Sequence, residues 1–192
     1  MRNVVVTEFI TLDGVFEDPG GAEKTEHGGW SFNFWSDESS KFKYDELMAA
    51  DALLLGRVTY EGFAAAWPDM TDESGFAERM NGLPKYVASR TLDKVEWQNS
   101  HLIEGDVVEA VSALKQEDGQ NILVGGSGEL ANTLLQHGFV DELRFLVSPV
   151  VLGGGRRFFE DGSPPRVLEL AEAVAFDTGV LALTYRRRRE AA

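Results

Sequence analysis

The sequence predicts an α/β protein with a mostly parallel central sheet, flanked by helices and completed by an antiparallel C-terminal hairpin. Three observations support this fold class. Apolar, β-branched segments alternate with segments of helical periodicity as far as Gly138, and a glycine-rich turn, Gly125 to Gly128, joins a buried segment to a helical one. The remainder of the chain has strand patterns without a strong helix. Alternating units predict a parallel sheet covered on both faces, and the final hairpin adds antiparallel strands.

The first part of the chain reads as strand, helix, strand, helix, strand. Asn3 to Ile10 is β-branched and aromatic, which predicts a strand. Glu38 to Ala50 is a helical stretch, and the short apolar run Ala52 to Leu55 after it predicts the second strand. Val58 to Ala66 is a second helix candidate, and Lys85 to Ser89 predicts a third strand.

The middle of the chain repeats this alternation. Asp106 is placed to cap a helix that ends near Gly119, because apolar residues recur after it at helical spacing. Ile122 to Val124 predicts a buried strand that runs into the glycine turn Gly125 to Gly128. Leucines at helical spacing then predict a helix, which Gly138 stops.

The last third of the chain predicts strands at Glu142 to Val150, Arg166 to Phe176 and Val180 to Arg188. Asp177-Thr178-Gly179 predicts a tight turn between the last two. The arginine run Arg186 to Arg189 ends the final strand, where a solvated edge or a subunit contact is expected.

Composition restricts the function. With 192 residues, 43% of them apolar, and no linker or repeat, we expect one domain over residues 1–192. The absence of cysteine excludes disulfides and thiolate metal sites, and the three histidines lack metal-ligand spacing, so no metal is expected. The net charge of −14 disfavours nucleic acid as a partner. The N-terminus has no signal-peptide pattern and no run could span a membrane, which predicts a cytoplasmic protein.

The glycine turn is the strongest candidate for binding chemistry. It places free N–H groups and the positive end of a helix where a phosphate can bind. Gly126, Gly128 and Ala131 also satisfy the dinucleotide pattern G-x-G-x-x-G/A, although the turn follows a late strand and not the first. The alternative is a turn that needs glycine only for its positive φ.

Two other strand ends carry similar groups. Gly56-Arg57-Val58-Thr59 offers a cation and a hydroxyl at the start of a helix, and Ser89-Arg90-Thr91 offers hydroxyl, guanidinium and hydroxyl. Taken alone, the first could be an exposed arginine with a threonine cap. Because ligands of parallel sheets collect at the carboxyl ends of strands, the three segments together predict an extended ligand with several phosphates.

Five segments in order carry a family resemblance. They are Thr11-Leu12-Asp13-Gly14, Leu55 to Glu61, Lys85 to Leu92, Gly125 to Leu130 and Pro149 to Gly155. Together they resemble the reductase family that includes dihydrofolate reductase, and they are most similar to stand-alone relatives of the C-terminal reductase domain of the riboflavin-biosynthesis deaminase-reductase RibD. The resemblance spans nearly the whole chain and implies a dihydrofolate-reductase-like fold.

The resemblance implies NADPH as the cofactor and hydride transfer as the reaction. The residues implied to bind NADPH are Gly56, Arg57, Thr59, Ser89, Arg90, Thr91, Gly125, Gly126, Ser127, Gly128 and Leu130. The nominal substrate of the riboflavin branch is 5-amino-6-(5-phosphoribosylamino)uracil, and the resemblance also favours a homodimer. A gap-free count back from Gly56 places Ser40 where dihydrofolate reductases carry a pterin-binding carboxylate, with Asp37 and Glu38 slightly earlier, which argues against folate reduction.

On the substrate side, Asp13 is the candidate catalytic acid, with a turn residue before Gly14 as its alternative. Trp30 and Phe34 could wall a flat heteroaromatic pocket or belong to the core. Arg156 and Arg157 are the candidate cations for a substrate phosphate. The expected activity is reduction of a C=N or C=O bond in a pteridine- or aminopyrimidine-like small molecule. The alternatives are dihydrofolate reductase, another small carbonyl or imine reductase, and a nucleotide-binding protein without turnover.

Overall fold

A computed structural model describes residues 1–159 and 162–188. The strands are β1 (Asn3–Thr11), β2 (Ala50–Gly56), β3 (Lys85–Ala88), β4 (Ser100–Leu102), β5 (Asn121–Gly125), β6 (Glu142–Ser148), β7 (Leu168–Ala175) and β8 (Leu181–Arg187). The helices are the 3₁₀ helix η1 (Trp30–Phe34), α1 (Asp37–Met48), α2 (Arg57–Ala66), α3 (Phe76–Gly82), α4 (Val107–Gln116) and α5 (Gly128–Gln136).

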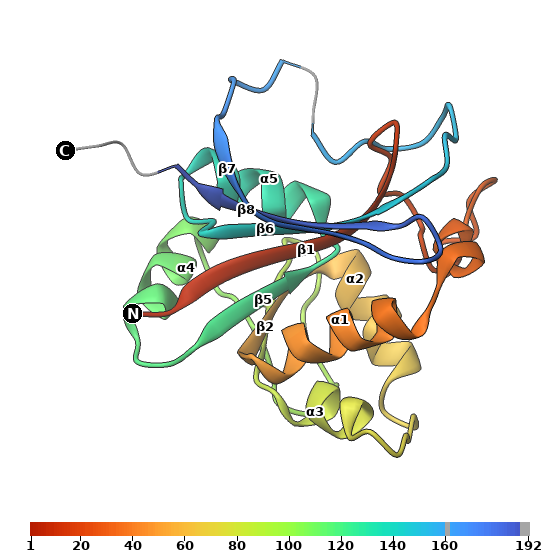
Figure 1. Ribbon diagram of the computed structural model, residues 1–192. Coiled ribbons are helices and arrows are strands. Elements are labelled where there is room, and N and C mark those ends of the chain that lie inside the picture. Colours follow the sequence, from red (N-terminus) through yellow and green to blue (C-terminus); the bar gives the residue numbers. More distant parts are fainter. Residues whose placement is uncertain (160–161, 189–192) are drawn as a thin grey trace.

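Within the described residues, eight strands form one sheet in the order β4-β3-β2-β5-β1-β6-β8-β7. The first six strands of this order are parallel, and β8 runs antiparallel to both β6 and β7. β1 is therefore central and β7 lies at an edge (Figure 1). The predicted fold class, a mostly parallel sheet with an antiparallel C-terminal hairpin, is confirmed.

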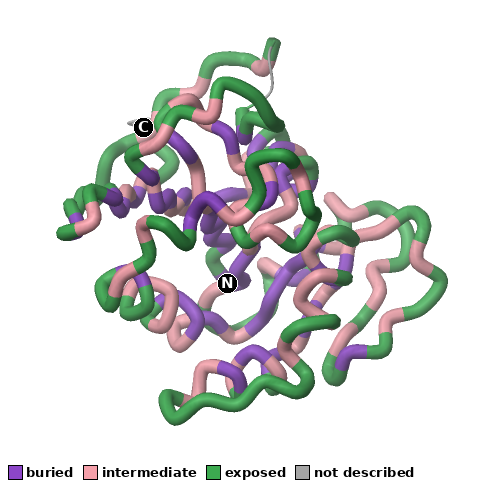
Figure 2. The backbone as a smooth tube through the Cα atoms, turned by 90° about the vertical axis from the view of Figure 1, so that its right-hand side faces the viewer, coloured by how far each residue is buried: buried purple, intermediate pink, exposed green. Residues whose placement is uncertain are grey.

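Helices cover both faces of the sheet, because alternate residues of the central strands are apolar on each side. Val4 and Val6 of β1 pack on the side of α4 and α5, while Val5 packs with α1, α2 and α3. Figure 2 shows buried backbone concentrated in these central strands and exposed backbone in the surrounding loops. The core is thus made of two apolar layers, one on each face of the sheet.

The 3₁₀ helix η1 and two further short elements, β4 and α3, were not expected from the sequence. β4 has only three residues and pairs with β3 in the register Lys85↔Ser100, too short a run to give a periodic signal. α3 begins after Gly75, whose φ is 81°, and the Asp72 carboxylate accepts hydrogen bonds from the N–H groups of Phe76 and Ala77. A carboxylate four residues before a helix does not match the usual spacing of a cap.

Several expected boundaries shift by one to three residues. The expected helix 38–50 ends at Met48 because Ala50 already belongs to β2, and the strand expected to reach Val150 ends at Ser148. Asp106 caps α4 as expected, accepting hydrogen bonds from the N–H groups of Val108 and Glu109. The turn at 177–179 joins β7 to β8, with the Gly179 N–H donating to the Phe176 carbonyl at 2.9 Å.

Candidate functional site

The predicted cofactor segments meet at one edge of the sheet. β2 and β3 are parallel and in register up to Gly56↔Ala88, and β5 runs parallel between β2 and β1 up to Gly125. The segments that start at Gly56, Ser89 and Gly125 therefore all follow carboxyl ends on the same edge. The structure brings the three segments together as the sequence predicts.

Ser127 connects two of these segments directly. Its hydroxyl accepts a hydrogen bond from the Gly56 N–H at 2.8 Å and donates one to Thr59 Oγ1 at 2.9 Å. Ser127 adopts a left-handed conformation with φ of 66°, and Gly126 before it has φ of 59°. A Cβ atom at Gly126 would lie 2.7 Å from Thr59 Oγ1, so this position requires glycine for both its dihedral and its packing.

Two helix N-termini open at this junction without side-chain caps. α2 follows Gly56 and α5 follows Ser127, and neither residue makes a side-chain capping bond. Thr59 therefore does not cap α2, contrary to the alternative considered for it. The first N–H groups of a helix need partners, and two adjacent positive helix ends favour an anion. This junction could hold the pyrophosphate of a dinucleotide.

The glycines of the turn differ in what surrounds them. A Cβ atom at Gly125 would have no neighbour within 4 Å, so the space beside it is open to a ligand. At Gly128 a Cβ atom would collide with the Phe16 ring, so this glycine serves packing. The Leu130 side chain is buried in the core, and only its backbone N–H is placed for a phosphate.

The two candidate arginines on the cofactor side lie on the surface. Arg57 pairs with Glu61 at 2.8 Å, and both side chains are about half exposed. Arg90 is exposed, and no ion pair joins it to another described residue. The Ser89 hydroxyl oxygen accepts hydrogen bonds from the N–H groups of Thr91 and Leu92. Ser89 therefore folds its own turn and keeps its O–H free to donate to a phosphate.

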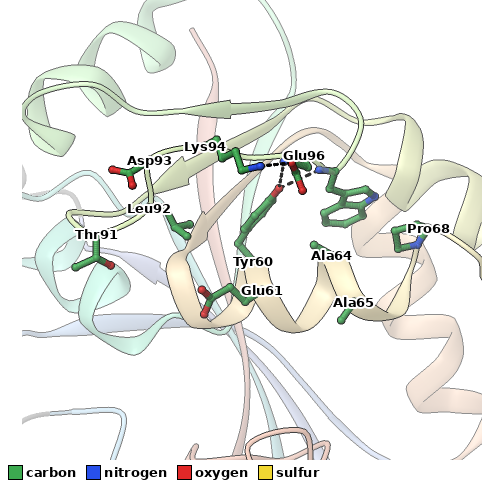
Figure 3. A pocket seen from close by; sticks show the side chains of 11 residues that line it. Tyr60, Glu61, Ala64, Ala65, Pro68, Thr91, Leu92, Asp93, Lys94 and Glu96 are labelled. Carbon is green, nitrogen blue, oxygen red and sulfur yellow. Dashed lines mark hydrogen bonds and ion pairs between the residues drawn. The ribbon is translucent and has the colours of Figure 1, made fainter.

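A cavity of about 780 Å³ lies between α2 and the segment after β3 (Figure 3). Thr91 lines it, with the acidic residues Glu61, Asp93 and Glu96. Lys94 also lines it but is paired with Glu96 at 2.5 Å. The net negative charge suits an uncharged ring or ribose better than a phosphate. The phosphates of a dinucleotide would be held outside this cavity, on the side of the uncapped helix ends.

Asp13 joins the loop after β1 to the glycine run at 153–155. Its carboxylate accepts hydrogen bonds from Thr11 Oγ1 at 2.6 Å, the Gly153 N–H at 2.9 Å and the Leu152 N–H at 3.3 Å. The Thr11 hydroxyl and these N–H groups lower the pKa of Asp13 below its usual value. An ionised carboxylate bound in this way fits a loop anchor better than a proton donor.

The candidate substrate arginines are also engaged in this loop. Arg156 forms ion pairs with Glu17 and Glu23, each at 2.7 Å, so its charge is compensated. Arg157 is exposed, and its Nε donates to the Asp13 carbonyl at 2.9 Å. Of the two, Arg157 is the one whose charge no described carboxylate neutralises.

The predicted aromatic wall is composed differently from the expectation. Trp30 is 4% exposed and its Nε1 donates to the Glu17 carbonyl, so it belongs to the core of its loop. Phe34 is half-buried and packs into a small apolar cluster below α1. Trp35 is 42% exposed and lies 5.9 Å from the Phe9 ring. Trp30 therefore matches the core alternative, and the exposed aromatic side chains of this segment are Trp35 and Phe32, which is 64% exposed.

Sequence reasoning missed the buried acidic side chains of β1 and α1. Glu46 of α1 accepts hydrogen bonds from Lys43 Nζ at 2.6 Å and from Thr7 Oγ1 at 2.9 Å. Glu8 is 4% exposed, and burial raises its pKa to about 8, although Lys43 opposes the shift. The signal that could have revealed Glu8 was its position as the one acidic residue in a strand that is otherwise uncharged.

Two absences apply to the part of the chain that the structure describes. Over residues 1–159 and 162–188, no three His, Asp or Glu side chains are grouped in a way that could hold a metal ion. In the same part of the chain, every helix is too short or too polar to cross a membrane.

Comparison with solved structures supports the fold. A putative riboflavin biosynthesis protein from Shewanella sp. PV-4 is similar with a TM-score of 0.76 and 20% identity, over 97% of this chain and 99% of that one. Dihydrofolate reductase from Enterococcus faecalis, complexed with NADP(H) and RAB-propyl, has a TM-score of 0.61 and 18% identity over 97% of each chain. A Thermotoga maritima diaminohydroxyphosphoribosylaminopyrimidine deaminase/5-amino-6-(5-phosphoribosylamino)uracil reductase has a TM-score of 0.66 and 18% identity, over 97% of this chain and 57% of that one.

These neighbours support the dihydrofolate-reductase-like fold that the five sequence segments imply. A family model described as the RibD C-terminal domain matches residues 2–182, which is nearly the whole chain. The chain therefore belongs to the RibD C-terminal domain family.

Proposed function

We propose that the protein is an NADPH-dependent reductase that transfers hydride to a C=N or C=O bond of a pteridine- or aminopyrimidine-like small molecule. The observation that carries this proposal is the junction of Gly56, Thr59 and Ser127, where two uncapped helix N-termini meet at the carboxyl edge of the sheet. Such a junction suits a pyrophosphate, the group common to dinucleotide cofactors.

The chain's own residues would align the cofactor along this edge. The N–H groups at the starts of α2 and α5 would bind the pyrophosphate, and Arg57 and Arg90 are the cations near the adenosine end. Arg57 would exchange its exposed partner Glu61 for a phosphate at little cost, because a surface ion pair contributes at most about 1 kcal/mol. NADPH supplies the hydride when bound, and the protein supplies alignment and exclusion of water.

The choice of substrate class rests on the family and on the absence of a carboxylate at the Ser40 position of α1. The Thermotoga maritima neighbour is named as a 5-amino-6-(5-phosphoribosylamino)uracil reductase, which supports the same nominal substrate here. Ser40, at the position expected for a pterin-binding carboxylate, accepts a hydrogen bond from Trp35 Nε1 at 2.9 Å and carries no charge. This disfavours dihydrofolate as the substrate. Arg157 is the cation available for a substrate phosphate.

The proposal is tested by incubating the protein with NADPH and a panel of acceptors, and following the loss of reduced cofactor. The panel contains 5-amino-6-(5-phosphoribosylamino)uracil, pterins, dihydrofolate and simple diketones. Oxidation with the ribosylaminouracil is the expected result. Oxidation only with diketones would identify a general carbonyl reductase, and binding of NADPH with no oxidation at all would identify a nucleotide-binding protein without turnover.

We also propose that the protein acts in the cytoplasm as a homodimer that pairs through the C-terminal strands. β7 is an edge strand whose side chains from Glu169 to Ala175 are exposed, and Leu170 and Val174 are 52% and 41% exposed. An exposed apolar edge favours pairing with a second copy. Light scattering should give the mass of a dimer, and Leu170→Glu should give a monomer. A wild-type monomer would contradict the proposal.

The arginine run 186–189 was expected to end the last strand at a solvated edge or a subunit contact. Its last residue, Arg189, lies outside the described residues.

A further inference from the structure

We propose that Glu8 of β1 is the acid that gives the substrate its proton when hydride is transferred from NADPH. This inference rests on the proposed reductase function and adds a catalytic residue to it. It starts from two independent observations, the place of Glu8 in the sheet and the state of its carboxyl group.

Glu8 lies where β1 loses its neighbour on one side. β1 pairs with β5 as far as Thr7↔Gly125, while its pairing with β6 continues to Thr11↔Ser148. Glu8 is therefore the first residue of β1 beyond the end of β5, one position past the partner of Gly125. At this point β5 turns away into Gly126 and the N-terminus of α5. Glu8 thus borders the turn that would hold the cofactor.

The Glu8 side chain lies on the α5 face of the sheet. Its register partner on β6 is Phe145, and parallel strands in register direct paired side chains to the same face. Phe145 belongs to the apolar cluster that α4 and α5 cover, and its ring packs 5.3 Å from Phe158. An acidic side chain is therefore inserted into an apolar layer beside the candidate cofactor site.

The Glu8 carboxyl group has no partner. Its Oε1 is buried without a hydrogen bond, and no described residue donates a hydrogen bond to either of its oxygens or forms an ion pair with it. Of the other buried carboxylates of the described chain, Asp18 accepts from the Glu23 and Thr25 N–H groups. Glu46 also has a buried Oε1 without a hydrogen bond, but its Oε2 accepts from Lys43, so that carboxylate as a whole has a partner. A buried polar group without a partner is costly and needs an explanation outside folding.

The surroundings of Glu8 keep it protonated at neutral pH. Burial raises its pKa to about 8, and the charge that opposes this shift is Lys43, which Glu46 already neutralises at 2.6 Å. On the α5 face, where Glu8 itself lies, the buried polar side chain of Asn132 donates to the carbonyls of Gly128 and Phe158 and not to Glu8. Glu8 is therefore left as a neutral acid with a proton to give.

The step balances with NADPH as the reductant. Hydride from the nicotinamide C4 forms a C–H bond at the substrate carbon, and the π pair of the C=N bond moves to nitrogen. That nitrogen takes the proton of the Glu8 carboxyl group, leaving NADP⁺, the reduced substrate and the Glu8 carboxylate. Water then returns a proton to Glu8, which its raised pKa favours at neutral pH.

The test compares the wild type with Glu8→Gln, which keeps the shape of the side chain and removes the acidic proton. We expect kcat to fall by at least about a hundredfold, the range of a lost general acid, while the affinity for NADPH stays unchanged. The melting temperature should be equal or higher, because the variant no longer buries an ionisable group. In the wild type, kcat should be at its maximum below pH 8 and decrease above it. The residual kcat of Glu8→Gln should not decrease in this pH range.

The outcomes separate this inference from the function on which it rests. If the wild type binds NADPH but reduces no acceptor, the reductase proposal fails and the proton step fails with it. If the wild type is active and Glu8→Gln keeps kcat and the fall above pH 8, the reductase stands and Glu8 is not its acid. Carbon-13 NMR of the Glu8 carboxyl provides a readout without substrate: titration at an ordinary glutamate pKa would overturn the inference directly.

Discussion

Ser127 donates a hydrogen bond to Thr59 across 2.9 Å, and through it the turn after β5 is fixed to the first turn of α2. The two residues are far apart in the sequence, yet their contact sets the distance between two helix N-termini. The same serine accepts from the Gly56 N–H, so the junction holds both turns at once. A pyrophosphate bound here would meet N–H groups whose positions are fixed before it arrives.

Gly125→Val tests this junction more cleanly than a change at Gly126. Valine at Gly126 would force a positive φ and collide with Thr59, so it would damage the fold as well as the site. At Gly125 the added side chain would enter open space. We expect Gly125→Val to melt near the wild-type temperature and to lose NADPH binding, measured by titration on the same sample.

The matched control is Gly82→Val, at the end of α3, where a Cβ atom also has no neighbour within 4 Å. This variant should bind NADPH as the wild type does. If Gly125→Val also binds NADPH with unchanged affinity, the cofactor does not approach this turn.

The second prediction concerns cofactor selectivity. Arg57→Gln or Arg90→Gln, whichever arginine contacts the 2′-phosphate, should weaken NADPH by roughly tenfold to a hundredfold and leave NADH nearly unchanged, since a charge-assisted hydrogen bond contributes about 1.5 to 3 kcal/mol. Glu61→Gln is the complementary variant, because it frees Arg57 from its ion pair and should strengthen NADPH. Equal losses for NADPH and NADH would show that the arginines are structural.

The third prediction separates the two roles considered for Asp13. Its hydrogen bonds to Thr11 and to the N–H groups of Leu152 and Gly153 hold its pKa below the usual value, so it is ionised throughout the neutral range. Asp13→Ala should therefore release the loop and raise KM several-fold, with the pH dependence of kcat unchanged. A lost limb in the pH profile would instead make Asp13 the catalytic acid.

The fourth prediction concerns Lys85, which is fully buried without a carboxylate partner among the described residues. Its Nζ donates to the carbonyls of Asn81, Leu83 and Gln98, and it lies 4.1 Å from the centre of a Trp97 ring. Burial lowers the pKa of Lys85 from 10.5 to about 8. Between these values the unfolded chain holds the proton more tightly than the folded one, so the contribution of Lys85 to the free energy of unfolding rises with pH.

Lys85→Met should unfold more easily at pH 7 by about 1 to 3 kcal/mol, because buried carbonyls lose their donor. The difference in unfolding free energy between wild type and variant should then widen from pH 8 towards 10, as measured by denaturant titration. Parallel curves for the two proteins would mean that Lys85 titrates outside this range.

The sequence by itself determined the fold class and the positions of the three candidate anion-binding segments. Apolar periodicity distinguishes strands from helices locally, and the glycine or hydroxyl residue that follows a strand is visible without coordinates. Gly56, Ser89 and Gly125 could therefore be placed at strand ends. Because parallel strands share one carboxyl edge, their proximity followed from the alternation of elements. β4 and α3 were missed because short elements carry little periodic signal.

Only the tertiary structure decided which charged and aromatic side chains are free to act. Arg156 and Asp13 were candidates by type, but the first is compensated by Glu17 and Glu23 and the second is bound by backbone N–H groups more than a hundred residues away. The structure likewise shows that Trp30 is buried, while Phe32 and Trp35 of the same segment are exposed. Glu8 shows the reason most directly. The sequence of a strand does not show how deeply a carboxylate within it is buried, and the pKa of Glu8 depends on which groups of distant segments are packed around it.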